Sequence, residues 1–333
     1  MKIKPITILK ITVSLGLLAL VLTRVDLNQA WMQFQQLSLP FVALALIYYT
    51  GCQWLSCLRW QVILRSNGYL VSIGILLSSY FVGMFLNIFL PGSFGGDVYR
   101  VYRVAQKTKD SEAAVVSVFV ERFTGISALS GLAILGLPPA FKVVGSWDII
   151  LLFFTCVTAL MAAVLLIASP RLLIWAEPWL EKLRLGSLAA RFAKIQLLLR
   201  QFAQHRKALA LAMGLSLLLM LAIIHYHYLV AQQLKIPISY LQLLVFIPIL
   251  TVIAILPISL GGLGVKEGLW VYLFSRIGLT AEQALLLSVT LTFLAWLAAL
   301  PGCLLLLLDS AGIQYIKQGY SDRNSSPSPN KLN

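Results

Sequence analysis

The chain has 333 residues, of which 59% are hydrophobic and only 11% charged, and its formal net charge is +14. Soluble domains carry about a quarter charged residues. This composition therefore excludes an ordinary soluble fold and predicts an all-α, polytopic transmembrane helical bundle. The basic residues flank apolar segments, which indicates contact with an anionic membrane leaflet and argues against nucleic-acid binding.

Eight apolar segments approach the roughly 20 residues that a helix needs to cross a bilayer. In chain order they are 6–22, 41–58, 73–90, 113–137, 149–168, 209–230, 241–256 and 284–308. The first resembles the apolar part of a signal peptide, but Arg24 and Asp26 stand where a cleavage site would follow. We therefore expect a retained first helix. The expected transmembrane domain covers 1–312, and the polar tail 313–333 is expected to be disordered.

A short motif occurs twice. Residues 90–96 read LPGSFGG and residues 256–262 read LPISLGG, so five of seven positions are identical. One copy alone would indicate a mere kink, whereas two copies suggest duplicated halves, about 1–140 and 145–310. The residues expected to shape the two motifs are Asn87, Pro91, Gly92, Gly95, Gly96, Pro257, Gly261, Gly262 and Gly264.

The distribution of basic residues predicts the topology. Lys107, like Arg59, Arg65 and the eight Lys and Arg of 170–207, is expected on the cytoplasmic side. Residues 73–104 must then enter and leave on one side as a re-entrant hairpin. If 241–274 forms a second hairpin, each half has three crossings and the halves are inverted. Full spans in place of the hairpins would instead give eight crossings and parallel copies.

The segment 170–207 is basic and amphipathic. Its apolar residues recur at steps of four and three, as on one face of a helix. They are Leu188, Phe192, Ile195, Leu199 and Phe202. This pattern predicts a linker helix in the membrane interface, held by acyl chains and anionic headgroups; the alternative is a solvated linker helix.

Charges at membrane depth are costly and are therefore functional candidates. Glu121 and Arg122 lie inside the fourth apolar segment. Small and polar residues share the Glu121 face, which favours close helix packing or a wet cavity. They are Ala114, Ser117, Thr124, Ala128 and Gly131. The alternative interpretation is purely structural, with Glu121 paired to Arg122 or to a neighbouring helix.

Further charges follow each Gly-Gly pair. Asp97 and Arg100 follow the first, and Lys266 and Glu267 follow the second. A helix that begins beside Gly-Gly and carries Arg is suited to bind an anion. We predict these four residues, with Glu121 and Arg122, to bind a polar substrate group. The alternative is that they extend to the membrane interface.

No motif for nucleotide hydrolysis, serine catalysis or zinc proteolysis occurs. His225 and His227 are two residues apart and therefore point to different sides of a helix, which disfavours a metal site. We expect no metal, no cofactor and no enzymatic activity.

Residues 87–100, with the pattern NxxLPGSFGGDxxR, and residues 257–268, PISLGGLGVKEG, together resemble the hallmark of a known family. This is the lysylphosphatidylglycerol synthase transmembrane-region family, also called the flippase-like domain family, and the resemblance extends over about 4–309. Its best-known members fuse this region to a soluble aminoacyl transferase domain and move aminoacylated phosphatidylglycerol between leaflets. Residues 313–333 are merely polar, so lysyl transfer is not expected here.

The resemblance implies a flippase-like translocator of a phospholipid or lipid-linked intermediate. We expect it in the plasma (inner) membrane of a prokaryote, with both termini cytoplasmic and membrane lipids as partners. The alternative is a non-transporting scaffold for a lipid-modifying or glycosyl transferase.

Overall fold

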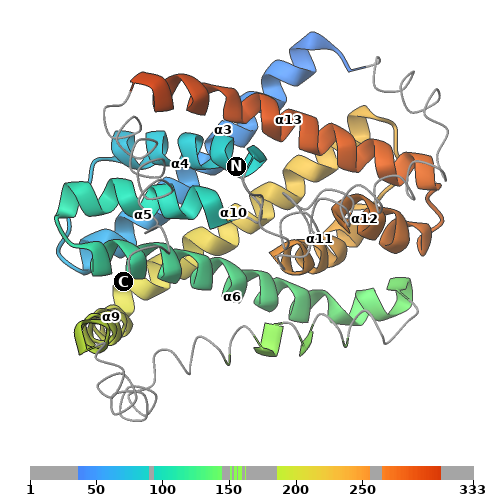
Figure 1. Cartoon of the computed structure of the whole chain (residues 1–333). Coiled ribbons are helices and arrows are strands. Elements are labelled where there is room, and N and C mark those ends of the chain that lie inside the picture. The colour runs from blue at the N-terminus through green and yellow to red at the C-terminus, as the bar shows by residue number, and fades with distance from the viewer. Residues whose placement is uncertain are drawn as a thin grey trace, which may run out of the picture.

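The structure is a computed structural model, and it describes residues 37–89, 94–144, 186–255 and 265–308, together with seven residues between 151 and 162. These residues are helical apart from short connections, with no strand among them. Figure 1 shows the helices. They are α3 (Leu39–Ser66), α4 (Ile73–Phe89), α5 (Phe94–Thr108), α6 (Ser111–Val144), α9 (Gly186–Gln204), α10 (Arg206–Gln233), α11 (Tyr240–Ile255), α12 (Val265–Ser275) and α13 (Ala281–Leu308).

Four of these helices, α3, α6, α10 and α13, contain stretches long and apolar enough to cross a membrane. The predicted all-α membrane fold is therefore confirmed, and six of the eight predicted segments correspond to described helices. Segment 6–22 and most of segment 149–168 lie outside the described residues. The apolar helices α4 and α11 have 17 and 16 described residues, and each reaches the end of a described range.

The helix ends follow from local sequence. Thr280 and Gln283 bond reciprocally at the start of α13, and Ser239 and Gln242 do the same before α11. These are capping boxes, in which two side chains satisfy backbone N–H groups that lack helical partners. After α3, Gly68 adopts φ 84°, a left-handed conformation that glycine accepts without strain. Such signals explain why the apolar segments begin and end near the predicted positions.

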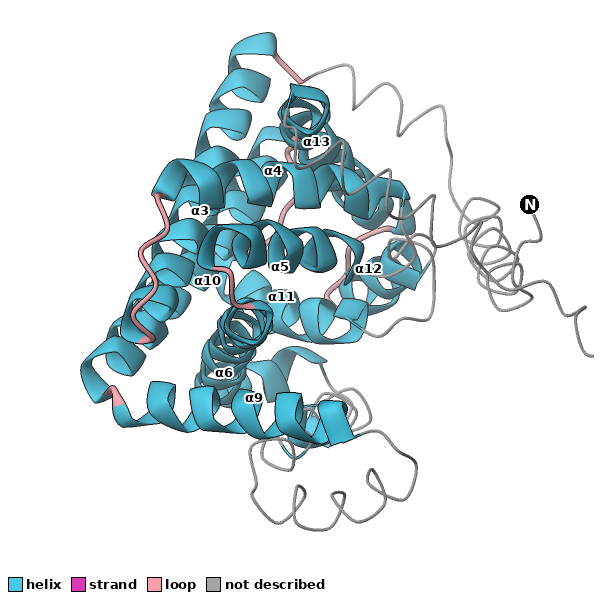
Figure 2. Ribbon diagram, turned by 60° about the vertical axis from the view of Figure 1, so that its left-hand side comes forward, coloured by secondary structure: helices cyan, strands magenta, loops and turns pink. Residues whose placement is uncertain are grey.

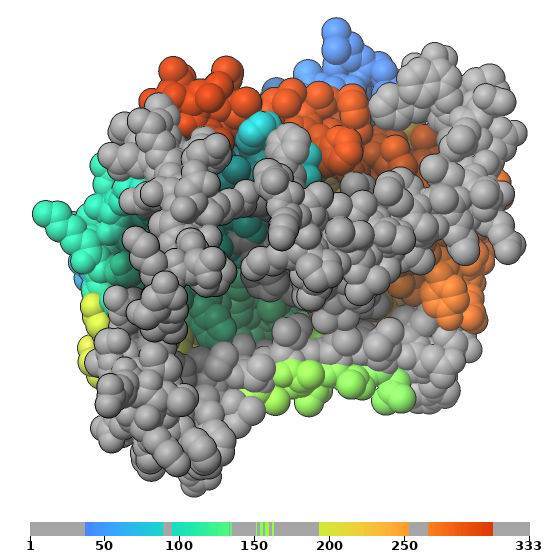
Figure 3. Space-filling view, viewed as in Figure 1, coloured from blue at the N-terminus to red at the C-terminus, as the bar shows by residue number. Residues whose placement is uncertain are grey.

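Helices of the two predicted halves pack against each other in pairs: α3 against α10, α4 against α13, and α6 against α11. Figure 1 shows α13 running across the top of the bundle and α6 across the bottom, with α10 passing diagonally between them. In the space-filling view α13 forms the upper edge of the same face (Figure 3). The largest apolar cluster draws most of its buried residues from α10 to α13. The repeat itself stays a prediction, but every one of these pairings joins its two halves.

Two backbone contacts bring helices very close together. A Cβ on Gly96 of α5 would overlap the carbonyl group of Gly83 on α4. A Cβ on Gly302 of α13 would overlap the carbonyl group of Phe81 on α4. Glycine is therefore required at Gly96 and Gly302, and α4 is held between α5 and α13.

Basic residues cluster at one end of the bundle. This end carries Arg65, Lys107, Lys109, Lys194, Arg200, Arg206 and Lys207, whereas Lys235 and Arg276 lie in loops at the other ends of α10 and α13. Helix α9 lies across the basic end (Figure 2).

The environment predicted for the amphipathic linker is partly corrected. In α9, Leu198 and Phe202 are buried, and Ile195 and Leu199 pack beside them against α3, α6 and α10. This part of the apolar face is covered by protein rather than by acyl chains, because the ends of three helices leave an apolar surface there. The side chains of Leu188 and Phe192 lie outside the described residues.

Candidate functional site

A buried ion network surrounds Glu121 in the first half of α6. The Glu121 carboxylate, on a residue 2% exposed, pairs with Arg59 from α3 through Oε1 and with Arg100 from α5 through Oε2. The Tyr80 hydroxyl on α4 donates to Oε1 at 2.5 Å. Because a buried carboxylate is costly unless it is paired and hydrogen-bonded, these partners explain how Glu121 is tolerated inside the bundle.

A second carboxylate, Asp97, extends the network to the surface of α6. Asp97 Oδ1 accepts from Arg100 at 3.0 Å. Arg122 donates to both carboxylate oxygens of Asp97 at 2.9 Å, and the Arg122 side chain is 47% exposed. Three guanidinium groups thus share two carboxylates, which leaves one excess positive charge in this ion network.

Aromatic rings enclose the Arg100 guanidinium. Its central carbon lies 4.3 Å from the ring centroid of Trp60 and 3.9 Å from that of Tyr80. The Trp60 Nε1–H donates to Ser117 Oγ at 2.9 Å. The cation is therefore held by ring faces as well as by carboxylates, an arrangement that strengthens when water is excluded.

Arg59 is the member of this network that the sequence analysis did not select. We expected Arg59 at the cytoplasmic end of its span, but it lies inside α3, is 5% exposed, and also donates to Ser216 Oγ of α10 at 3.0 Å. The expected position after the span was wrong because α3 continues to Ser66, about two helical turns beyond Arg59, whereas the side of the membrane stays a prediction. Arg65, at the helix end, is exposed.

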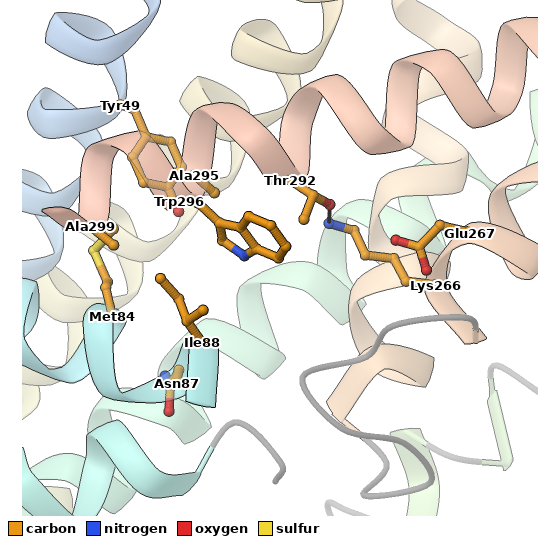
Figure 4. Close-up of a pocket in the computed structure, with 10 residues that line it drawn as sticks. All are labelled: Tyr49, Met84, Asn87, Ile88, Lys266, Glu267, Thr292, Ala295, Trp296 and Ala299. Atoms are coloured by element: carbon orange, nitrogen blue, oxygen red, sulfur yellow. Dashed lines mark hydrogen bonds between the residues drawn. The ribbon is translucent and has the colours of Figure 1, made fainter. Parts of the chain in front are cut away.

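A separate cavity of about 230 Å³ contains the other two predicted residues. Lys266 and Glu267 line it together with Asn87 from the first motif. Lys266 Nζ donates to Thr292 Oγ1 of α13 at 3.1 Å. Figure 4 shows Asn87 and Ile88 at the end of α4, with Lys266 and Glu267 approaching from α12. The remaining lining residues are Tyr49, Met84, Ala295, Trp296 and Ala299.

The cavity is placed at the level of the middle of α13, since Thr292 is near the centre of that helix. Asn87 also links the cavity to the first motif, because its Oδ1 accepts from the Gly96 N–H at 2.7 Å. Residues beside the two Gly-Gly motifs, far apart in the sequence, therefore line one cavity between α4, α12 and α13. Residues 90–93 and 256–264, including Pro91, Gly92, Pro257, Gly261, Gly262 and Gly264, lie outside the described residues.

The family model for the lysylphosphatidylglycerol synthase TM region matches residues 7–302. The chain belongs to this family. No curated protein and no solved structure matches it. As a member of the lysylphosphatidylglycerol synthase TM-region family, it is a multi-pass membrane protein with a fold suited to lipid metabolism or transport.

In this family member the six predicted site residues form two groups. Asp97, Arg100, Glu121 and Arg122 are joined in the ion network, and Lys266 with Glu267 lines the cavity. The six residues therefore do not line a single cavity in the described structure. Arg100 does not reach the cavity because Glu121, Asp97 and two aromatic rings hold its guanidinium on the α6 side of α5. Their role in binding a substrate stays a prediction.

The predicted polar stripe on α6 serves close helix packing in its described part. Ala114, Ser117, Thr124 and Ala128 are all buried, whereas Gly131 is exposed. Ser117 accepts the hydrogen bond from Trp60, and Thr124 bonds back to the Glu121 carbonyl oxygen. Small side chains here let α3 approach α6 closely enough for Arg59 to reach Glu121.

At the basic end, Asp110 connects the corner between α5 and α6 to α9. Its carboxylate accepts from Tyr69 at 2.6 Å, from Lys194 at 2.8 Å and from the Ala113 N–H at 3.0 Å. Burial raises the pKa of the Asp110 carboxyl, but the hydrogen bonds from Lys194, Tyr69 and Ala113 outweigh it and lower the pKa to about 2. The same pairing raises the pKa of Lys194.

Proposed function

We propose that this member of the lysylphosphatidylglycerol synthase TM-region family translocates a phospholipid or a lipid-linked intermediate across the plasma membrane of a prokaryote. In this proposal the chain forms two hairpins, α4–α5 and α11–α12. The polar headgroup binds in the cavity where Lys266 and Glu267 of α12 meet Asn87 of α4, while the acyl chains stay in lipid. The protein supplies binding and a path, and it performs no chemistry on the lipid.

The observation that carries this proposal is the cavity in which Lys266 and Glu267 meet Asn87 beside the middle of α13. A translocator needs a polar site near the membrane midplane, at an interface between its two halves. A charged side chain at membrane depth costs about 2.5–3.5 kcal/mol to insert. Charged residues that line such a cavity are therefore candidates for a substrate path.

The charge distribution supports the proposed orientation. Cytoplasmic loops are enriched in Lys and Arg, and the described basic residues concentrate at the end that carries Arg65, Lys107 and Arg206. This end is therefore proposed to be cytoplasmic, with α9 at the inner leaflet.

Reconstitution tests the proposal. Purified protein is incorporated into liposomes that contain fluorescent phosphatidylglycerol, and a membrane-impermeant reductant then bleaches the outer-leaflet label. We expect the protected fraction to fall below one half as lipid moves outward, and we expect Lys266→Met to restore protection. The same assay is repeated with phosphatidylethanolamine and with a polyprenyl phosphate. If folded and inserted protein leaves the protected fraction unchanged for all three lipids, translocation is wrong and the alternative of a non-transporting scaffold is favoured.

A further inference from the structure

Equivalent positions of the two motifs carry cations with different surroundings. Arg100 and Lys266 each lie four residues after the second glycine of their Gly-Gly pair. Each belongs to the shorter, charged helix of its pair, α5 or α12, and each contacts the helix that follows, α6 or α13. The two side chains can therefore be compared as counterparts.

The first cation is fully enclosed. Arg100 is 3% exposed, bonds to Glu121 and Asp97, and has an aromatic ring on each of two sides. The helix that follows supplies the carboxylate that neutralises it. An external anion would have to displace Glu121, and that carboxylate would then be left buried with fewer partners, which is strongly unfavourable.

The second cation lacks such a carboxylate. On α13 the Lys266 ammonium meets the neutral hydroxyl of Thr292, and among the described residues Lys266 forms no ion pair. Glu267 is its neighbour in sequence and lines the same cavity. An ammonium has three N–H donors, and Thr292 uses one of them. Since the described residues supply no further acceptor for Nζ, the other two donors can serve a group in the cavity.

We infer that the two counterpart cations have different tasks: Arg100 fastens the bundle, whereas Lys266 with Thr292 forms the subsite that selects an oxyanion of the substrate. This inference rests on the proposed function and assigns its headgroup selectivity to the second half of the chain. The cavity of about 230 Å³ accommodates a small group such as a phosphodiester, with Asn87 as a further hydrogen-bonding side chain. Thr292 is then a specificity-determining residue that the sequence motifs do not include.

The different tasks of Arg100 and Lys266 can be tested by placing a carboxylate beside Lys266, as Glu121 lies beside Arg100. In Thr292→Glu the new carboxylate neutralises Lys266, and the uncharged Thr292→Gln is the matched control. Full-length protein in neutral detergent is titrated calorimetrically with dihexanoyl phosphatidylglycerol, with inorganic phosphate and with uncharged dihexanoylglycerol. A charged hydrogen bond contributes ~1.5–3 kcal/mol, so we expect Thr292→Glu to weaken anion binding at least about tenfold more than Thr292→Gln does.

The ligand series separates a lipid headgroup from free phosphate. Binding of the short-chain lipid alone identifies the headgroup as the source of the oxyanion, and binding of inorganic phosphate with the same dependence on Thr292 identifies a general phosphate site. Either result supports the subsite. Equal affinity of Thr292→Glu and Thr292→Gln for every anion would overturn it.

A second pair of variants keeps the test decisive if Thr292→Glu does not fold. Lys266→Met should weaken anion binding without lowering the thermal unfolding midpoint, whereas Arg100→Met should lower that midpoint because Glu121 loses a partner. Arg100→Met protein that unfolds at the wild-type temperature but loses anion binding would place selection in the first half and overturn the inference. If anion binding depends on Lys266 but the protein moves no lipid, the proposed translocation is wrong and the anion subsite stands.

Discussion

Glu121 accepts from side chains on α3, α4 and α5, so one carboxylate fixes the relative rotation of four helices when its own helix, α6, is included. Arg59 adds α10 through Ser216. In a low-dielectric interior such a network is strongly favourable when every member is paired and strongly unfavourable when one is removed. Single substitutions should therefore act on stability before they act on any ligand.

Glu121→Gln removes the charge and keeps the shape of the side chain. Arg59 and Arg100 are then buried with no common carboxylate, and we expect a loss of about 3–5 kcal/mol in the free energy of unfolding. Denaturant unfolding in detergent measures this loss. Glu282→Gln, in the first turn of α13, is the control and should change stability by less than about 0.5 kcal/mol. Equal stability of Glu121→Gln and wild type would contradict the structural importance of the network.

Sequence reasoning identified Glu121, Arg122, Asp97 and Arg100 because a charge in or beside an apolar segment is visible without a structure. It left the partner of Glu121 open between Arg122 and a neighbouring helix, and in the structure the partners are Arg59 and Arg100 on neighbouring helices. Arg122 is next to Glu121 in sequence but binds Asp97 instead, because adjacent residues on a helix point about 100° apart. Arg59 was missed because it is close to a polar segment end, and only the length of α3 shows that it is buried.

The pair α4 and α5 depends on the contact between Gly83 and Gly96. Gly96→Ala places a methyl group against backbone atoms of Gly83, which cannot shift as the end of a flexible side chain can. We therefore expect the free energy of unfolding to fall by about 1–3 kcal/mol. Gly131→Ala is the matched control, since nothing lies within 4 Å of its added Cβ. Alanine there should stabilise the helix by up to ~1 kcal/mol. Thermal unfolding of both variants in detergent measures the contrast, and a shift in the same direction for both would contradict the close contact.

Helix positions were largely predictable because they follow from apolar length and capping residues, whereas helix contacts were not. The spacing of the apolar residues in α9 predicted an apolar helix face, but it did not show whether protein or lipid covers that face. Ile195, Leu199 and Phe202 pack on protein, and lipid and protein interiors select the same apolar side chains. The hairpins likewise stay a prediction.

The corner between α5 and α6 should make stability depend on acidity. Because the pKa of Asp110 is lowered in the folded protein, its contribution is present above pH ~4 and is lost as the pH falls toward 2. Asp110→Asn keeps a good helix-capping residue but loses the ion pair with Lys194. We expect a lower unfolding midpoint than wild type at pH 6, and convergence of the two proteins near pH 2. Parallel curves over this whole range would contradict the assignment of the ion pair.

The arrangement of the whole chain is tested by the sidedness of two turns. Cysteine replacing Lys107 should react with an impermeant maleimide from the cytoplasmic side, and cysteine replacing Glu282 should react from the opposite side. The positions are separated because α5 ends at the basic end of the bundle, whereas α13 begins at the other. Labelling of both from one side would contradict the inverted arrangement of the halves.

The pairing of Arg59 with Glu121 also constrains how the protein enters the membrane during synthesis. The partners are 62 residues apart, so α3 leaves the ribosome long before α6 exists. A lone Arg within a newly made helix costs about 2.5–3.5 kcal/mol to insert. We therefore expect newly synthesised α3 to stay in contact with the translocation channel until α6 has been synthesised. The helices of the first half would then enter the lipid together.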